Sequence, residues 1–150
     1  MIAVVQRVDS ASVDVEGIGT TGAIERGLCV LLAVEGGDTE ADAVWMAGKI
    51  ARLRIFSDAS GRFNDSLVDV SGSVLLVSQF TLAGDCSRGN RPSFVGAASP
   101  ELARPLYQLV GTLLRERHAV PVETGRFQES MSVALVNSGP ATIILRSDDR

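Results

Sequence analysis

The residues best suited to chemistry form one short polar run, Ser78-Gln79-Phe80-Thr81, which directly follows the apolar segment 74–77. Two hydroxyl groups, an amide and an aromatic ring at the end of a buried strand can build the polar floor of a binding pocket. Regular strand alternation would place Ser78 and Phe80 on one face and Gln79 and Thr81 on the other. An ordinary polar strand end is the competing interpretation.

A second candidate is the pair Gly139-Pro140, where one apolar run stops and another begins. Proline fixes its own φ and has no N–H, and glycine brings no side chain, so the pair makes a rigid corner. Such a corner can present backbone carbonyl oxygens to a ligand, and X-Pro is the bond type in which a cis isomer costs little. On its own the dipeptide favours a simple tight turn.

Basic and aromatic residues gather in a Gly- and Pro-containing loop that includes Arg88, Arg91 and Phe94. Arginine suits bidentate contacts with phosphate, and an aromatic ring can stack on a base, so the loop is a candidate RNA contact. A solvated loop is the alternative interpretation. A similar polar loop, residues 125–130, ends at Met131.

Familiar catalytic patterns are missing from the sequence. The single histidine, His118, follows Arg115 and Arg117 at the end of a helical pattern, where a helix C-terminus favours cationic groups. A Ser-His-Asp triad would have to use His118, and nothing places it beside a nucleophile. Cys29 and Cys86 have no second Cys or His at metal-ligand spacing. We therefore expect neither a metal nor another cofactor.

The composition limits the classes of partner that the protein is expected to bind. The 150 residues are 45% hydrophobic and 21% charged, which suits a single domain over residues 1–150. No apolar run approaches the roughly 20 residues that a membrane span needs, so we expect a cytoplasmic protein with reduced thiols. The formal net charge is −4, and all basic residues except Lys49 are arginine. RNA would have to bind a local basic patch, and neither DNA nor a membrane is an expected partner.

Hydrophobic patterning predicts the elements that position these residues. The pattern predicts strands at 2–15, 28–34, 73–80, 120–124 and 131–145, helices at 39–53 and from Pro100 onward, and a turn at 17–22. This order lacks the regular alternation of strand and helix that a doubly wound fold needs. It predicts an α+β fold in which a curved or barrel-like mixed sheet is flanked by two helices.

Taken together, these segments resemble one family closely, the D-aminoacyl-tRNA deacylases, also called D-tyrosyl-tRNA deacylases. The resemblance spans nearly the whole chain in one order. Its most specific part is the pairing of the run 78–81 with the Asn-x-Gly-Pro-x-Thr run at 137–142. The matching segments are Ala3–Val8, Ala11–Val13, Arg54–Phe56, Ser78–Leu82, Arg91–Phe94, Pro121–Phe127, Met131 and Leu135–Thr142.

The resemblance implies a homodimer that hydrolyses the ester between a D-amino acid and the 3′ end of tRNA, and that also removes mischarged glycine. It implies that Gly139 and Pro140 form a cis motif that reaches into the partner's pocket. There, backbone oxygens would bind the substrate's α-amino group and leave no space for an L side chain. Arg7 would orient this motif, and Asn137 would belong to the same substrate-binding set.

The resemblance also assigns the polar run. Ser78, Gln79, Phe80 and Thr81 would line the pocket for the terminal adenosine and the scissile ester, and Met131 would close one wall. The terminal 2′-hydroxyl of the tRNA would assist the reaction. Thr81 could act as a nucleophile or as a positioning group, and we favour positioning because no base stands beside it in the sequence.

The chain departs from the family pattern in two loops. Residues 128–130 read Gln-Glu-Ser where relatives carry small residues, and residues 84–87 read Gly-Asp-Cys-Ser where an Ala-Asp-Thr run is more usual. Asn90 stands where arginine is common, which removes one phosphate contact. Three hypotheses stand: an editing esterase, a non-enzymatic tRNA-binding module that uses the 88–94 loop, and a small esterase with a Thr81 nucleophile.

Overall fold

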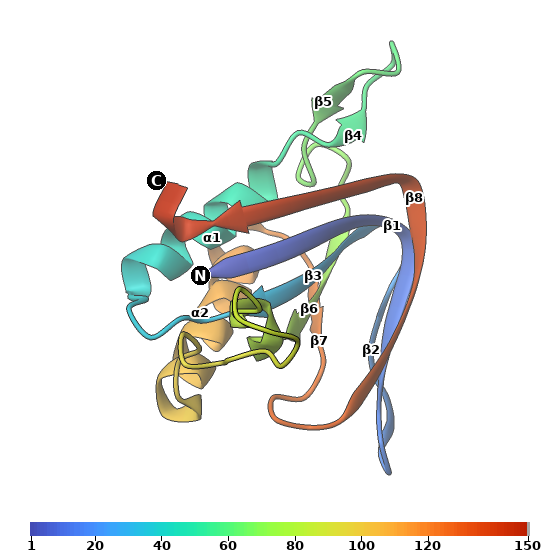
Figure 1. The fold of residues 1–150 in the computed structure, drawn as a ribbon. Helices are drawn as coiled ribbons and strands as arrows, with labels where there is room; N and C mark the ends of the chain where they lie inside the picture. The colour runs from blue at the N-terminus through green and yellow to red at the C-terminus, as the bar shows by residue number, and fades with distance from the viewer. Residues whose placement is uncertain (150) are drawn as a thin grey trace.

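The computed structural model describes residues 1–149, which form one large mixed sheet, a small hairpin and two long helices (Figure 1). This arrangement confirms the α+β fold with two flanking helices. The strands are β1 (Ile2–Val15), β2 (Gly19–Ile24), β3 (Gly27–Ala33), β4 (Phe56–Ser57), β5 (Phe63–Asp65), β6 (Ser73–Ser78), β7 (Val122–Thr124) and β8 (Met131–Arg146). The helices are α1 (Glu40–Arg52), α2 (Pro100–His118) and the short 3-10 helices η1 (Phe80–Ala83) and η2 (Ser147–Asp149).

The long strand β1 organises the sheet. Along one edge it pairs antiparallel with β8, and along the other it pairs with β3 through its first half and with β2 through its second. Strands β6 and β7 add in parallel beyond β3, which gives the order β2-β1-β3-β6-β7. In this register Leu32 of β3 lies beside Ser78 of β6. The carboxyl ends of these two parallel strands therefore meet at one place.

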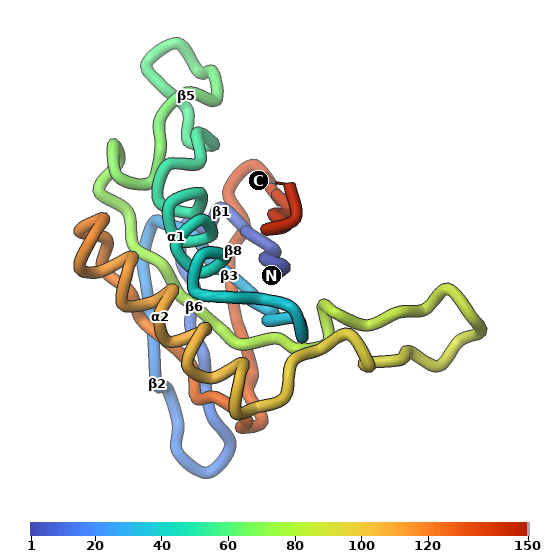
Figure 2. Tube along the Cα trace, turned by 90° about the vertical axis from the view of Figure 1, so that its left-hand side faces the viewer, coloured from blue at the N-terminus to red at the C-terminus, as the bar shows by residue number. Residues whose placement is uncertain are grey.

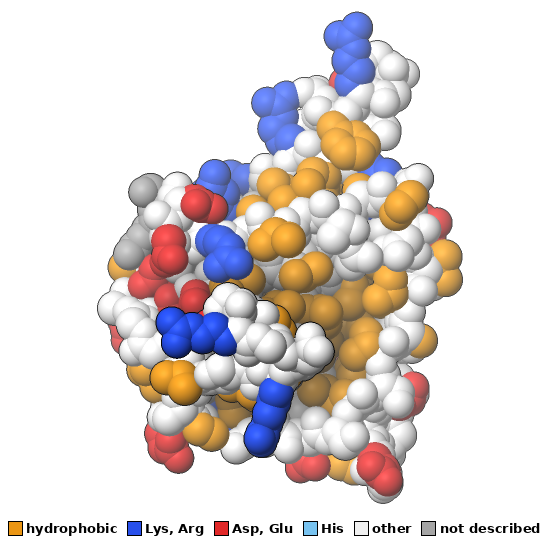
Figure 3. Space-filling model, viewed as in Figure 1, with side chains coloured by type: hydrophobic (Ala, Val, Ile, Leu, Met, Phe, Trp, Pro, Cys, Tyr) orange, Lys and Arg blue, Asp and Glu red, His pale blue; other side chains and the backbone are white. Residues whose placement is uncertain are grey.

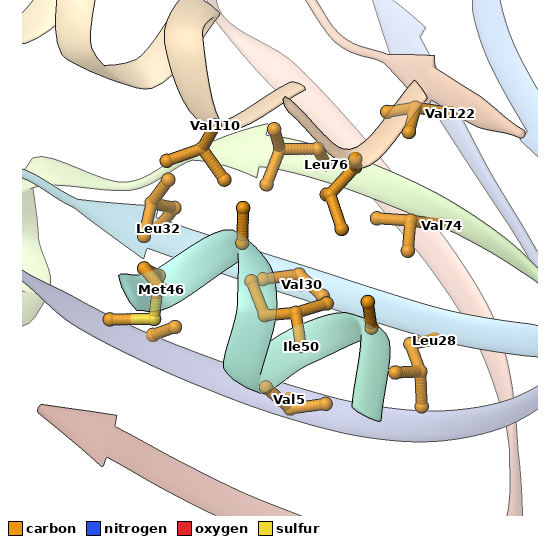
Figure 4. Packing of buried hydrophobic residues seen from close by; sticks show 14 of the residues in the cluster. Val5, Leu28, Val30, Leu32, Met46, Ile50, Val74, Leu76, Val110 and Val122 are labelled. Atoms are coloured by element: carbon orange, nitrogen blue, oxygen red, sulfur yellow. The ribbon is translucent and has the colours of Figure 1, made fainter. Parts of the chain in front are cut away.

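The main core lies between the sheet and the two helices. Met46 and Ile50 of α1 pack with Val30 and Leu32 of β3 and with Val110 of α2 (Figure 4). All five side chains are buried, and burial of an aliphatic side chain of this size stabilises a fold by about 1.5–3 kcal/mol. Strand alternation turns the other side chains to the opposite face, where Val13, Cys29 and Val77 belong to a second buried cluster.

Two segments differ from the expectation. Residues 17–22, expected as a turn, contribute most of β2 because their backbone pairs with the second half of β1. Strand β6 ends at Ser78, and the chain then turns into η1. The alternation expected for residues 78–81 is therefore wrong, since the backbone leaves the sheet before the pattern can continue.

Two further features bear on function. The segment between η1 and α2 projects from the body of the molecule as a long loop (Figure 2). Among residues 1–149, no helix combines the length and the apolar character that a membrane crossing requires.

Candidate active site

A cavity of about 680 Å³ opens where β3 and β6 end. Ser78, Gln79 and Phe80 line it at the end of β6, and Met131 at the start of β8 lines it from another part of the chain. In Figure 3 apolar side chains gather in a hollow on this face of the molecule. A concave, mostly apolar site with a few polar groups is the usual form of a small-molecule pocket.

A backbone hydrogen bond fixes the turn at the end of β6. The N–H of Gln79 donates to the carbonyl oxygen of Leu32 at 2.8 Å, which ties this residue to the neighbouring strand. The side-chain Nε2 of Gln79 donates to Oγ1 of Thr81. Thr81 is exposed and is not one of the residues that line the cavity. Its hydroxyl is therefore placed to orient Gln79.

Two aromatic pairs line the cavity. The ring centroids of Phe80 and Phe94 lie 5.2 Å apart in an edge-to-face arrangement, and those of Tyr107 and Phe127 lie 5.8 Å apart. All four rings contribute to the same cavity. Flat aromatic surfaces of this kind can hold a nucleobase or an aromatic side chain.

Tyr107 is a hydrogen-bond donor that stays protonated. Its hydroxyl donates to the carbonyl oxygen of Leu76 at 2.7 Å. Burial raises the pKa of Tyr107 far above its usual range, and nearby Arg115 only partly opposes that rise. The phenol of Tyr107 is therefore not available as a general base at neutral pH. Glu129 is the one carboxylate among the described residues that line the cavity.

The histidine and the cysteines lie outside this cavity. His118 lines a separate groove, and its pKa is lowered by burial and by the charges of Arg52 and Arg117. Burial raises the pKa of the Cys29 thiol to about 11, which keeps it protonated. Among residues 1–149, no cluster of three or more His, Cys, Asp or Glu side chains could hold a metal ion.

The Gly139-Pro140 corner occupies a different place. It lies in a bulge of β8 where Arg7 of β1 alone faces residues 138–141. The Gly139–Pro140 peptide bond is cis, and both residues are exposed. Neither residue is among those that line the cavity. One chain thus presents the corner and the cavity at separate places.

Arg7 fastens the corner to the sheet. This residue is only 9% exposed, and its Nε donates to the carbonyl oxygen of Ser138 at 2.9 Å. Its Nη1 donates to the carbonyl oxygen of Ile55 at 2.5 Å, and its guanidinium carbon lies 4.9 Å from the ring centroid of Phe63. A Cβ at residue 139 would collide with Nη2 of Arg7, and φ of Gly139 is +116°. The backbone angle requires glycine here, and any added side chain would also have to displace the Arg7 guanidinium.

Asn137 secures the first arm of the bulge. It pairs with Val8 in the sheet, and its Oδ1 accepts a hydrogen bond from Nε2 of Gln6 at 2.9 Å. Both polar contacts come from β1 and hold the arm before the tip, whereas the arm after it is held by the backbone pairing of Thr142 with Gln6.

The structure separates the three candidate RNA contacts. Arg88 and Arg91 are exposed on the projecting loop, where Asp85 and Ser93 pair through two backbone hydrogen bonds of 2.8 and 2.9 Å. Phe94 lies past this pairing and lines the cavity. The two arginines do not line the cavity.

Sequence reasoning did not select Tyr107 or Phe127. Tyr107 lies among the leucines of the α2 apolar stripe, so its pattern indicates only core packing. Phe127 offered a weak signal, because it is an aromatic residue in a polar loop shortly before Met131. The packing of α2 beside β6 brings Tyr107 to the cavity, and the segment after β7 places the Phe127 ring against it.

The fold and the cavity define a small α+β protein with an aromatic-walled site in which the described residues supply no paired nucleophile and base. Residues 4–146 match the family model described as D-Tyr-tRNA(Tyr) deacylase. The chain belongs to this deacylase family.

Full-length relatives agree with this family. The chain is 54% identical over 150 residues to "D-aminoacyl-tRNA deacylase" of Geobacter sulfurreducens, covering 100% of this chain and 97% of the relative. It is also 54% identical over 147 residues to the protein of the same name from Thermotoga petrophila, covering 98% and 97%.

Solved structures share the fold. "c-Myc DNA Unwinding Element Binding Protein" superposes with a TM-score of 0.91 at 40% identity, covering 97% of this chain and 98% of that one. "Structural Analysis of a probable eukaryotic D-amino acid tRNA deacylase" describes a chain that superposes with a TM-score of 0.85 at 17% identity, covering 96% and 97%. The second likeness concerns the fold alone.

Proposed function

We propose that this chain is a D-aminoacyl-tRNA deacylase, a hydrolase that splits the ester between a D-amino acid and the 3′ end of tRNA. The observation that carries this proposal is the cavity at the end of β6, where the polar side chains of Ser78 and Gln79 lie beside the aromatic pair Phe80 and Phe94. Family membership and the full-length relatives support it. Residues 1–150 act as one catalytic domain in the cytoplasm.

A second copy of the chain completes the site. The corner at Gly139-Pro140 is exposed and does not line its own cavity. Strand β8 pairs only with β1 among the described residues, so its other edge is open. An open edge strand offers unpaired backbone groups to a partner. In the homodimer, the corner of one protomer enters the cavity of the other.

The corner acts as a chirality filter. The carbonyl oxygens of Gly139 and Pro140 accept hydrogen bonds from the substrate's α-ammonium group, and the backbone fills the space that an L side chain would need. Arg7 and Asn137 hold this backbone in place. Rejection by steric exclusion requires no contact with the D side chain. Many D-aminoacyl-tRNAs are therefore substrates, and so is glycyl-tRNA, because glycine has no side chain to exclude.

Catalysis depends mainly on positioning. Ser78, Gln79 and Phe80 hold the terminal adenosine and the ester, and Met131 closes a wall. The tRNA's own terminal 2′-hydroxyl assists the attack of water, and polar groups at the cavity floor stabilise the oxyanion. The reaction needs no cofactor. Arg88 and Arg91 contact tRNA phosphates, and Phe94 stacks on a base.

The deciding experiment compares the two enantiomers of one substrate. Purified protein without added metal should release amino acid from D-tyrosyl-tRNA at least about tenfold faster than from L-tyrosyl-tRNA, the range that steric discrimination readily reaches. Glycyl-tRNA should be cleaved as well. Equal rates on both enantiomers would exclude the proposal. Salt-dependent tRNA binding with no turnover would favour the non-enzymatic binding module.

Thr81→Ala should lower kcat by less than about tenfold, because Thr81 orients Gln79 and does not attack the ester. Thr81→Ser keeps the hydroxyl and should retain the wild-type rate. Single-turnover deacylation of D-tyrosyl-tRNA measures both variants. Complete loss in Thr81→Ala, together with an acyl-enzyme detected by mass spectrometry in the wild type, would instead establish Thr81 as a nucleophile.

A further inference from the structure

A basic groove of about 610 Å³ lies along α2. Arg104, Thr112 and Arg115 of α2 line it at spacings that place them on one side of the helix, and Arg126 lines it from the segment after β7. Glu129 is the one acidic residue among the described residues that line it. The chain as a whole has a formal net charge of −4, so this groove is a positively charged region on a protein that is negative overall.

The groove adjoins the substrate cavity. Tyr107, Phe127 and Glu129 line both. The guanidinium carbon of Arg104 lies 4.8 Å from the ring centroid of Phe127, and its Nη2 donates to Oε1 of Gln128 at 2.8 Å. A positive charge is thus held at the junction of groove and cavity.

The arginines keep donors available for an anion. Nε and Nη2 of Arg115 donate to the carbonyl oxygen of Val122 at 3.3 and 2.8 Å, which fixes the guanidinium in place. A guanidinium has five N–H donors, so three remain. Within residues 1–149, none of Arg104, Arg115 and Arg126 forms an ion pair with a carboxylate.

We propose that this groove binds the phosphodiester backbone of the tRNA strand that leads to the 3′ end; the inference rests on the deacylase function proposed above. An ester bound in the cavity leaves the rest of the nucleic acid outside, and the adjoining arginines match phosphates in charge and in geometry. A second basic groove, lined by Lys49, Arg52 and Arg117, shares no residue with the cavity.

The test measures binding of uncharged tRNA over a range of salt concentrations. Arg115→Gln combined with Arg126→Gln should weaken binding near 0.1 M salt by about tenfold or more, and should lower the salt slope by about 0.7 for each lost single-strand phosphate contact. Arg126→Gln alone gives a reading that does not disturb the Val122 contact. Arg117→Gln removes the same charge from α2 outside the groove and should leave the slope unchanged.

A kinetic measurement separates this inference from the deacylase function. The double variant should raise KM for D-tyrosyl-tRNA by about tenfold more than KM for D-tyrosyl-adenosine, which has no phosphodiester. If the double variant turns over substrate and keeps wild-type affinity and salt slope, the groove does not bind phosphates, although the deacylase function stands. If binding depends on the two arginines but no turnover occurs, the groove binds tRNA and the deacylase function is wrong. A larger effect of Arg117→Gln than of Arg126→Gln on tRNA binding would also contradict the proposed role of the groove.

Discussion

Gly139→Ala is expected to lower kcat/KM for D-tyrosyl-tRNA by about a hundredfold or more, the effect of misplacing a group that orients substrate. The added Cβ would collide with the Arg7 guanidinium, and φ at this residue is +116°, an angle that L side chains rarely adopt. The corner is exposed, so the hydrophobic core should remain folded. Single-turnover deacylation beside thermal unfolding of the same sample measures both effects.

Gly17→Ala is the matched control. Gly17 also has a positive φ, +75°, but a Cβ there would meet nothing within 4 Å. This variant should retain wild-type activity, because it carries backbone strain without displacing Arg7. In an Arg7→Ala background the further loss from Gly139→Ala should shrink, since residues in direct contact are energetically coupled. A Gly139→Ala variant with the wild-type rate would disprove the role of the corner.

Replacing the terminal adenosine of D-tyrosyl-tRNA with 2′-deoxyadenosine should slow hydrolysis by about a thousandfold, within the usual range for loss of acid–base assistance. The reason lies in the cavity, where the described ionisable residues are Glu129 and the protonated Tyr107. His118 lies in another groove. The proposed mechanism therefore assigns the assistance of water to the 2′-hydroxyl of the substrate. Product release from the two tRNAs under single-turnover conditions measures the effect.

A 2′-deoxy nucleotide one position before the terminal adenosine is the matched control for this substrate change. It removes one hydroxyl from the same strand but leaves the reacting ribose intact, so the rate should stay near that of unmodified tRNA. Full activity with the terminal 2′-deoxy substrate would show that protein groups alone activate the water. Equal losses with both substrates would indicate a binding effect of the strand.

The local hydrophobic pattern of the sequence was sufficient to predict the elements that form the core. Alternating and continuous apolar runs predicted β1, β3 and β8, because burial repeats along β1 and β3 and half-buried residues alternate with exposed ones along β8. The end of β6 could not be predicted in the same way. The hydrogen bond from the N–H of Gln79 to Leu32 depends on the pairing of two distant strands.

The candidate site was predicted in part for a similar reason. Ser78, Gln79 and Phe80, expected as the floor of a pocket, line one cavity with Met131, and Phe94, expected only in an RNA-contacting loop, lines it too. Tyr107 joins them only through the packing of α2, which no short motif encodes. The same holds for the basic groove, whose arginines come from α2 and from the segment after β7.

The way β1 holds both arms of the corner has a consequence for how this protein can vary. Exposed loops usually tolerate insertions and deletions. This one interrupts a strand: Gln6 pairs with Thr142 on one side of the tip and Val8 pairs with Asn137 on the other. A strand shifted by one residue turns every side chain to the opposite face. The number of residues in the tip is therefore constrained. Deleting one residue must either change the conformation of the tip or shift the following arm by one residue, which turns its side chains to the opposite face of the sheet.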